Sequence, residues 1–245
     1  MKTELDVHTH TVACGHAYGT VSEMTAAALE KGLRLYGIAE HGPDQQKLIS
    51  DSFFDNLMVL PRRRNDLELL YGAELNIVDY TGRIYMNRNI YPYLDLRIAG
   101  IHSLSYTPGT VAQNTAAYLG AIENREIDVI SHPDDDRIKA DIETLCYAAW
   151  ENHTLLELNN NSLRAPGRVH VRENMFRILE LCRKLNHPVL LSSDAHCPQD
   201  VGNLSLVSEI VEEAGFPEEL VINSSAERFL AFIAENHPLA FHYER

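Results

Sequence analysis

The chain has 245 residues, 45% of them hydrophobic and 23% charged, and these values are ordinary for a soluble globular protein. Its formal net charge of −14 repels phosphate backbones and anionic lipid, so we expect neither nucleic acid nor a membrane as a partner. No apolar run approaches the roughly 18 residues of a membrane span, and the four cysteines lack paired spacing, which indicates free thiols in a cytoplasmic protein.

Strand-like and helix-like patterns alternate along the whole chain. The first strand begins at Leu5, and the others are predicted at 35–39, 67–71, 94–99, 127–131, 154–158 and 189–192. Helices are predicted at 20–31, 51–66, 110–124, 139–152, 171–185, 203–214 and 225–236, with a break in the second at Pro61 and an irregular hairpin insertion over 75–95. No linker or repeat interrupts this alternation, so we expect one domain over residues 1–245.

Seven strands that alternate with helices predict a parallel sheet with right-handed crossovers. An open doubly wound sheet would gather ligands at one switch point. Here side chains that can bind metal follow nearly every strand, and only a closed barrel brings all those strand ends around one axis. The positions of these residues therefore favour an α/β barrel.

The clearest of these positions is the stretch around His8 and His10. Alternate residues on a strand point to the same side, so the two imidazoles lie side by side at the strand's end. Two imidazoles on one face can form half of a metal site. The motif is short, however, and on its own is equally compatible with two hydrogen-bonded histidines.

Seven of the twelve histidines fall at strand ends or in the loop just beyond, together with two carboxylates. The nine candidate ligands are His8, His10, His16, His41, Glu74, His102, His132, Asp194 and His196. Mostly imidazole donors with a few carboxylates suit zinc, and also manganese or iron. Nine donors exceed the needs of one tetrahedral ion, so two or three ions are expected. The other five histidines, which are His153, His170, His187, His237 and His242, are taken as structural.

These residues, in this order, resemble the signature of the polymerase and histidinol phosphatase (PHP) family, and in their spacing its small stand-alone members. The resemblance runs from the first strand to the last helix. It implies a distorted (β/α)7 TIM-like barrel that binds three divalent metal ions, typically zinc, and hydrolyses small phosphomonoesters. By the family pattern His8, His10, Glu74 and Asp194 hold one ion, and Glu74 bridges to a second, which His102 and His132 also bind. His16, His41 and His196 hold the third.

Two positions depart from that family pattern. Glu40 precedes His41 where an aspartate is common, and we expect it to support His41 or a neighbouring ligand from outside. Asp134, Asp135 and Asp136 follow His132-Pro133 where glycine is common. They could disfavour an anionic substrate or bind a cation, but a solvated loop is the favoured interpretation.

The expected reaction is attack on phosphorus by a metal-bound hydroxide, because bound metal lowers the pKa of water to about 7. Glu74 and Asp194 are the candidate catalytic residues, with Asp194 or a metal-bound water as the acid. Arg164 and Arg168 could clamp the phosphate, or could be surface arginines.

Two alternatives stay open, a non-catalytic metal-binding regulatory module and an amidohydrolase-type metallohydrolase. The second is disfavoured because no lysine follows a strand. The sequence leaves a homo-oligomer open.

Overall fold

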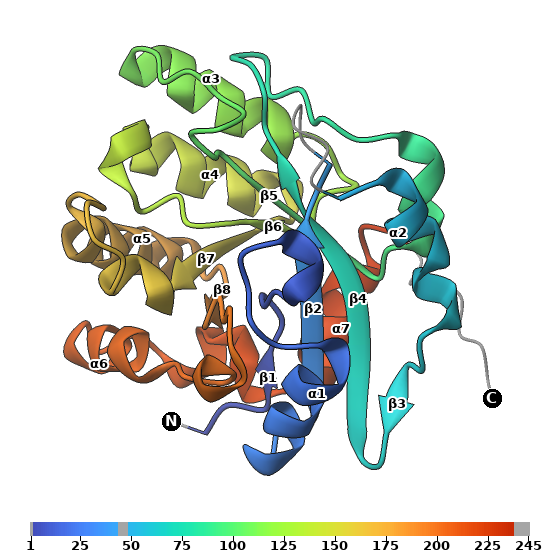
Figure 1. Cartoon of the computed structure of the whole chain (residues 1–245). Coiled ribbons are helices and arrows are strands. Elements are labelled where there is room, and N and C mark those ends of the chain that lie inside the picture. Colours follow the sequence, from blue (N-terminus) through green and yellow to red (C-terminus); the bar gives the residue numbers. More distant parts are fainter. Residues whose placement is uncertain (1, 44–48, 238–245) are drawn as a thin grey trace.

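The computed structural model describes residues 2–43 and 49–237, and its central feature is a parallel sheet curled into a barrel (Figure 1). In the described part, seven strands pair in parallel in the order β1-β2-β4-β5-β6-β7-β8. Their bounds are β1 (Leu5–Asp6), β2 (Leu35–His41), β4 (Leu67–Asn76), β5 (Leu96–Gly100), β6 (Val129–Ile130), β7 (Leu155–Asn159) and β8 (Val189–Ser192). The distorted (β/α)7 barrel is confirmed.

The barrel closes imperfectly between β8 and β1. Thr9 and Ala195 form an isolated parallel bridge, and the His10 N–H donates to the Ala195 carbonyl at 2.9 Å. Lower down, the buried Asn223 side chain fills the gap, because its Nδ2 donates to the carbonyls of Leu5 (3.1 Å) and Leu191 (2.8 Å). These bonds satisfy backbone groups that would otherwise be sheet edges.

Helices cover the outside of the barrel, and Figure 1 shows α3, α4, α5 and α6 side by side along one flank. The helices are α1 (Val21–Glu30), α2 (Asp51–Asp55), α3 (Val111–Ile122), α4 (Ile142–Asn152), α5 (Val171–Leu185), α6 (Ser205–Glu213) and α7 (Ala226–Ala234). A capping box begins α1, since Thr20 accepts from the Glu23 N–H and the Glu23 side chain accepts from the Thr20 N–H in return. None of the described helices combines the length and apolar character needed to span a membrane.

Two apolar clusters hold these layers together. The larger lies between the sheet and the outer helices. The smaller fills the barrel interior with side chains such as Leu35, Ile98 and Leu190, and it is closed by Phe229 and Ile233 from α7. The interior is thus packed up to the level at which the strands end, so only their carboxyl ends are free to carry a polar site.

The predicted helix over 51–66 is wrong in its second half. α2 ends at Asp55 and continues as one 3-10 turn over Asn56–Val59. Beyond Pro61 the chain forms a short antiparallel strand, β3 (Arg63–Arg64), which pairs with the start of β4. Asn65, at φ 54°, makes the tight turn between them, and asparagine tolerates this left-handed conformation. β4 runs past its predicted end at residue 71 to Asn76, so Glu74 lies within the strand and the predicted insertion begins later than residue 75. The other helices and strands lie close to their predicted positions.

Candidate metal centre

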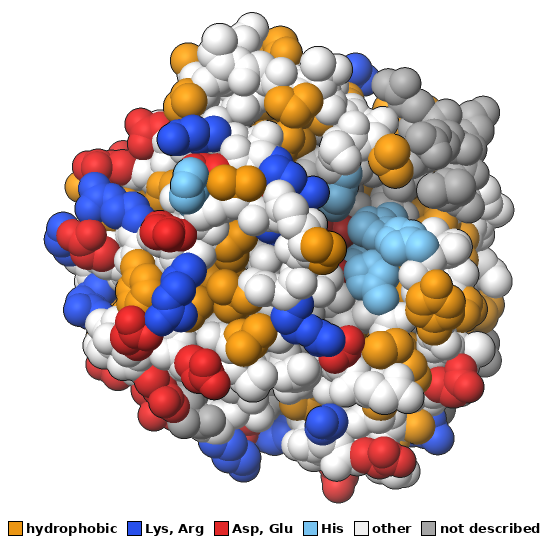
Figure 2. All heavy atoms as spheres, turned by 60° about the vertical axis from the view of Figure 1, so that its left-hand side comes forward, with side chains coloured by type: hydrophobic (Ala, Val, Ile, Leu, Met, Phe, Trp, Pro, Cys, Tyr) orange, Lys and Arg blue, Asp and Glu red, His pale blue; other side chains and the backbone are white. Residues whose placement is uncertain are grey.

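The nine side chains predicted to bind metal all lie at the carboxyl ends of barrel strands or in the loops just beyond. In the space-filling view, histidine side chains gather beside a hollow of the surface (Figure 2). The deepest members, His8 and His10, have no exposed area, and Glu74 is 1% exposed. Histidines and carboxylates are thus concentrated at one end of the molecule, partly out of water.

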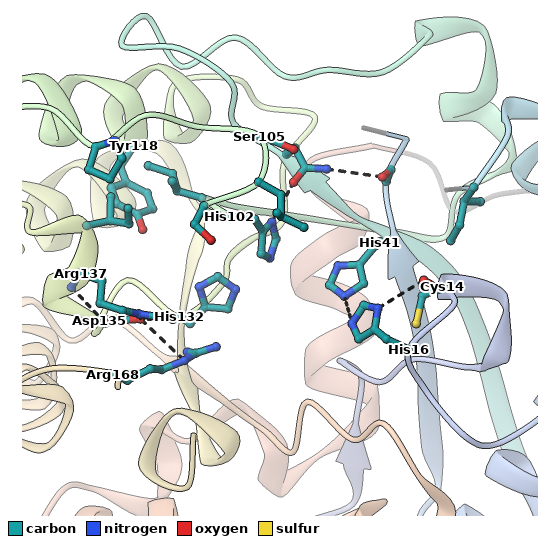
Figure 3. Close-up of a pocket in the computed structure, with 18 residues that line it drawn as sticks. Cys14, His16, His41, His102, Ser105, Tyr118, His132, Asp135, Arg137 and Arg168 are labelled. Atoms are coloured by element: carbon teal, nitrogen blue, oxygen red, sulfur yellow. Dashed lines mark hydrogen bonds and ion pairs between the residues drawn. The ribbon is translucent and has the colours of Figure 1, made fainter. Parts of the chain in front are cut away.

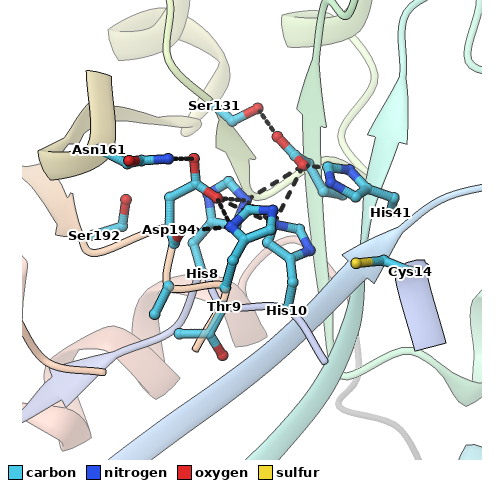
Figure 4. A network of polar contacts seen from close by, with 12 residues as sticks. His8, Thr9, His10, Cys14, His41, Ser131, Asn161, Ser192 and Asp194 are labelled. Carbon is cyan, nitrogen blue, oxygen red and sulfur yellow. Dashed lines mark hydrogen bonds and ion pairs between the residues drawn. The ribbon is translucent and has the colours of Figure 1, made fainter. Parts of the chain in front are cut away.

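His8 and His10 point inward because the residue between them is anchored to the sheet. The Thr9 hydroxyl lies 2.8 Å from the Gly37 carbonyl on β2 and 2.7 Å from the Tyr36 hydroxyl. With Thr9 held outward, its two neighbours face the barrel axis, where their Nε2 atoms lie 3.2 Å apart. Asp194 Oδ1 lies 3.2 Å from His10 Nε2, and Figure 4 shows these three residues directed at one another.

Glu74 lies at the centre of the cluster, and its two oxygens face different residues. Oε1 is 2.9 Å from His132 Nε2 and 3.2 Å from His102 Nε2. Oε2 is 2.9 Å from His41 Nδ1 and 3.4 Å from His8 Nε2. Burial alone would raise the pKa of Glu74, but the surrounding histidines, His102 and His8 foremost, hold that pKa well below its usual value. An ionised carboxylate therefore joins the two halves of the cluster.

A third group lies nearer the surface. His16 Nε2 is 3.2 Å from His41 Nε2 and 3.1 Å from His196 Nε2. His41 thus faces this group through Nε2 and Glu74 through Nδ1. Three sets of side chains bring one donor atom each within 4.8 Å of one another, and they are His10–His41–His196, His8–His10–Asp194 and His41–Glu74–His102. His41 is therefore closer to Glu74 than the family pattern implied.

The hydrogen bonds of the imidazoles test whether this cluster suits metal ions. Several Nδ1 atoms face oxygen atoms that can only accept a hydrogen bond. These Nδ1 atoms therefore carry the ring proton. His16 Nδ1 donates to the Cys14 carbonyl (3.3 Å), His196 Nδ1 to the Asp194 carbonyl (2.9 Å), His8 Nδ1 to Glu157 (2.6 Å) and His102 Nδ1 to Asn76 (2.8 Å). When such a ring is neutral, as a ring that binds metal must be, its one proton is on Nδ1 and its Nε2 presents a lone pair to the centre. Without metal, burial opposes the charged form of His8, but the carboxylates of Glu157 and Glu74 outweigh it and raise the pKa of this ring well above its usual value.

Lone pairs that converge on other lone pairs and on carboxylates repel one another unless a cation lies between them. The Nε2 atoms of His16 and His196 are such a pair, at 3.1 Å. In addition, His10 Nδ1 is buried with no hydrogen-bond partner among the described residues. This donor chemistry fits divalent ions that accept imidazole nitrogen and carboxylate oxygen.

Glu157 is the residue that the sequence analysis missed. It lies in β7 with no exposed area, and its carboxylate accepts from His8 Nδ1 and from the His132 N–H, at 2.6 and 2.7 Å. A histidine that binds metal through one nitrogen commonly donates to a carboxylate through the other. The available signal was a glutamate within an otherwise apolar strand.

Of the two departures from the family pattern, only the aspartates after Pro133 differ from expectation. Glu40 Oε1 accepts from the Thr11 N–H (3.0 Å) and from the Thr11 hydroxyl, so it holds the loop after His10 and agrees with the expected support of a neighbouring ligand rather than of His41. The solvated-loop interpretation is wrong for two of the three aspartates, since Asp134 has no exposed area and Asp135 is 7% exposed. Burial raises the pKa of Asp134 to about 7, although the nearby Arg168 opposes the shift.

A cavity of about 310 Å³ opens beside the cluster and is lined by His16, His41, His102 and His132. Arg168 also lines it (Figure 3), and its Nη1 donates a hydrogen bond to the Ser162 hydroxyl. Arg164 is not part of this lining; it pairs with Asp200 at 2.7 Å on the surface. Of the two predicted phosphate clamps, only Arg168 is positioned to act.

Four of the five histidines taken as structural lie in the described part of the chain, and they have partners outside the cluster. His187 Nε2 donates to the Thr154 carbonyl at 2.9 Å, and His153 stacks on Phe232. His170 lies beside Asp136, and His237 beside Asp128. His242 lies outside the described residues.

Comparisons with known proteins agree with this fold. A family model described as the PHP domain matches residues 6–161. A probable phosphatase of Clostridium novyi is 38% identical over 233 residues, which cover 95% of each chain. Another, from Caldicellulosiruptor bescii, is 39% identical over 233 residues and covers 95% of this chain and 96% of the relative.

Among solved structures, the histidinol phosphate phosphatase of Lactococcus lactis, determined with zinc, L-histidinol and phosphate, superposes with a TM-score of 0.65. The match covers 88% of this chain and 95% of that one at 15% identity, and it bears on the fold alone.

Proposed function

The chain belongs to the PHP domain family, and from this premise we propose that it is a phosphatase that hydrolyses small phosphomonoesters at a site of three divalent metal ions. Zinc is the ion that a mostly imidazole donor set favours. The observation that carries the proposal is the convergence of imidazole lone pairs and two buried carboxylates beside an open cavity. We also propose that residues 1–245 act as one domain.

The proposed ligands fall into three groups around Glu74. His8, His10 and Asp194 would hold one ion, with one oxygen of Glu74. His102 and His132 would hold a second through the other Glu74 oxygen. His16, His41 and His196 would hold the third, nearest the surface.

Divalent ions bound there would supply a water that ionises near neutral pH and would offset negative charge on the phosphoryl group. Glu157 keeps the ring proton of His8 on Nδ1, so that Nε2 stays a donor toward the ion. Arg168 orients the phosphate by donating to its oxygens from the cavity wall.

Asp194 fits a ligand better than a general acid. Burial would raise the pKa of its carboxyl, but the hydrogen bond with His10 and the charge of His8 hold that pKa well below its usual value. An ionised carboxylate has no proton to donate, so the leaving oxygen takes its proton from water in the cavity.

The test is a panel of phosphomonoesters assayed with metal-free and metal-loaded protein, alongside elemental analysis. We expect about three ions per chain, loss of hydrolysis on chelation and its recovery with zinc or manganese. His10→Ala should abolish turnover, whereas His153→Ala, at a half-exposed histidine outside the cluster, should not. Metal-loaded protein that turns over no phosphomonoester would favour a non-catalytic metal-binding module instead.

A further inference from the structure

The cavity extends beyond the candidate ligands, and its far side has a different character. Figure 3 shows Tyr118, Arg137 and Arg168 across the cavity from His16 and His41. The side chains on this far side are mostly apolar and come from the loop after β5, from α3 and from the turn before α4. They are Ile101, Leu104, Pro108, Tyr118 and Ile138. A leaving group attached to a phosphate at the ligand cluster would contact this apolar wall.

The apolar wall offers few hydrogen-bonding groups for the hydroxyls of a polyol. Asn76 lines the cavity, but its amide is committed to His102 Nδ1 and to the Gly42 carbonyl. This leaves the hydroxyls of Ser103, Ser105 and Tyr118 as the neutral polar groups on that side of the lining, where the charged Asp135, Arg137 and Arg168 pair with one another. A sugar would bury more hydroxyls than these groups can satisfy, and an unsatisfied buried hydroxyl opposes binding.

The charges at the end of the wall do not favour a second anionic group. Arg137 Nε and Nη2 lie 2.7 and 2.6 Å from Asp135 Oδ2, and Arg168 Nε lies 3.7 Å from the same oxygen. Asp135 thus balances one of the two guanidinium charges, and the buried Asp134 can only add to the negative side. At most one cationic charge therefore remains, and the phosphate of a monoester is sufficient to neutralise it.

Building on the proposed phosphatase activity, we propose that the substrate is a monophosphate ester of a compact, uncharged, apolar alcohol. The leaving group packs against Leu104, Tyr118 and Ile138. A cavity of about 310 Å³ is at the lower end of small-molecule sites, which span about 300–1,000 Å³, so the alcohol is small. Leu104, Tyr118 and Ile138 are then residues that determine specificity.

The experiment compares kcat/KM for four phosphate esters of primary alcohols, so that the reactivity of the leaving group is similar throughout. Benzyl phosphate represents the apolar neutral class, glucose 6-phosphate the polar neutral class, 3-phosphoglycerate the anionic class and phosphoethanolamine the cationic class. We expect benzyl phosphate to be preferred by about tenfold or more, the lower end of what apolar pockets achieve.

Two cavity variants and one control separate the wall from general effects on the protein. Leu104→Ser, at a side chain that is 70% exposed, should reduce the preference for benzyl phosphate without unfolding the protein. Ile138→Ser should reduce that preference further, by up to about tenfold. Val59→Ser, at an exposed valine outside the cavity lining, should leave it unchanged.

A preference for any of the three polar or charged esters overturns this proposal but leaves the phosphatase intact. An apolar preference that neither cavity variant reduces also overturns it. No turnover of any ester by metal-loaded protein, 4-nitrophenyl phosphate included, overturns the phosphatase proposal and this one with it.

Discussion

Glu157→Gln tests the role of a residue that supports a candidate metal-binding histidine without being a candidate ligand itself. The two carboxylate oxygens of Glu157 accept hydrogen bonds from four donors. These are His8 Nδ1 (2.6 Å), the Ser192 hydroxyl, the His132 N–H (2.7 Å) and Asn159 Nδ2 (3.1 Å). Glutamine has the same shape, but its NH2 group is a donor. In the place of Oε1 the amide nitrogen would face the His8 Nδ1–H, although the Ser192 hydroxyl could turn to accept from it; in the place of Oε2 it would face two donors, the His132 N–H and Asn159 Nδ2.

The magnitude follows from those contacts. A hydrogen bond to a charged group contributes about 1.5–3 kcal/mol, so losing one or two of them should lower the free energy of unfolding by about 1.5–6 kcal/mol. Removing a carboxylate behind a ligating histidine commonly costs about 10–100-fold in metal affinity or activity, which is about 1.4–2.7 kcal/mol. The loss should be concentrated at the ion bound by His8, because His8 Nε2 becomes a weaker donor.

The assay is a titration with a competing chelator that reports each ion's affinity, together with thermal unfolding. Glu68→Gln, the same chemical change at an exposed position near the start of β4, is the matched control and should alter neither measurement. A Glu157→Gln protein that is fully folded and binds every ion as tightly as the unmodified chain would refute the reasoning. Equal weakening of all ions would contradict the assignment to His8.

Glu74→Gln should remove two ions and abolish hydrolysis, because one carboxylate serves both halves of the cluster, whereas His16→Ala should remove only the outermost ion. Elemental analysis of the two variants decides, and the opposite pattern contradicts the bridge. Arg168→Lys should raise KM for phosphomonoesters by about tenfold, because Arg168 lines the cavity. Arg164→Lys should leave KM unchanged, because Arg164 is not part of that lining. Burial lowers the pKa of His187 from 6.5 to about 4, so this residue contributes about 3 kcal/mol of stability that is present above pH 6.5 and is lost as the pH falls toward 4. The free energy of unfolding, measured with urea at several pH values, should therefore fall less steeply below pH 6.5 for His187→Gln than for the unmodified chain.

The barrel and the cluster could be predicted from sequence because they share one cause. In a parallel barrel every strand ends at the same rim, so a ligand-type residue after each strand is evidence for both the fold and the site. His41 and Glu74 illustrate this, since they lie directly opposite one another in the register between β2 and β4. A strand position alone was enough to place them.

The role of Glu157 could not be predicted in this way, because its partner His8 is 149 positions away and the contact depends on side-chain geometry across the barrel. A charged residue within an apolar strand is not a specific signal either. Asp6 and Asp128 have the same character, yet they bond to the backbone of Ser193 and Arg97, outside the metal cluster. The sequence indicates that such a residue is buried, but it does not show which group the carboxylate contacts.

The aspartates after Pro133 were misjudged for a related reason. Three consecutive carboxylates indicate a solvated segment unless cations lie nearby in space. Asp135 is buried because Arg137 and Arg168 surround it, and Arg168 comes from a loop more than thirty residues further along the chain. Composition within the segment could not reveal that pairing.

Two of the six non-glycine residues with positive φ in the described part of the chain lie at the candidate metal centre. His132 and Asp194 adopt φ angles of 35° and 52°, a left-handed conformation that costs side-chain-bearing residues of order 1–3 kcal/mol each. Each lies one or two residues beyond a strand, where an ordinary extended residue would carry the side chain past the barrel axis instead of into the cluster. The lone pairs that converge around Glu74 repel one another, and this repulsion lowers the stability of the fold further. The barrel interior below, packed without polar groups from Leu35 to Ile233, is what stabilises the fold against both, so the site could not be displaced downward without losing the core that holds it.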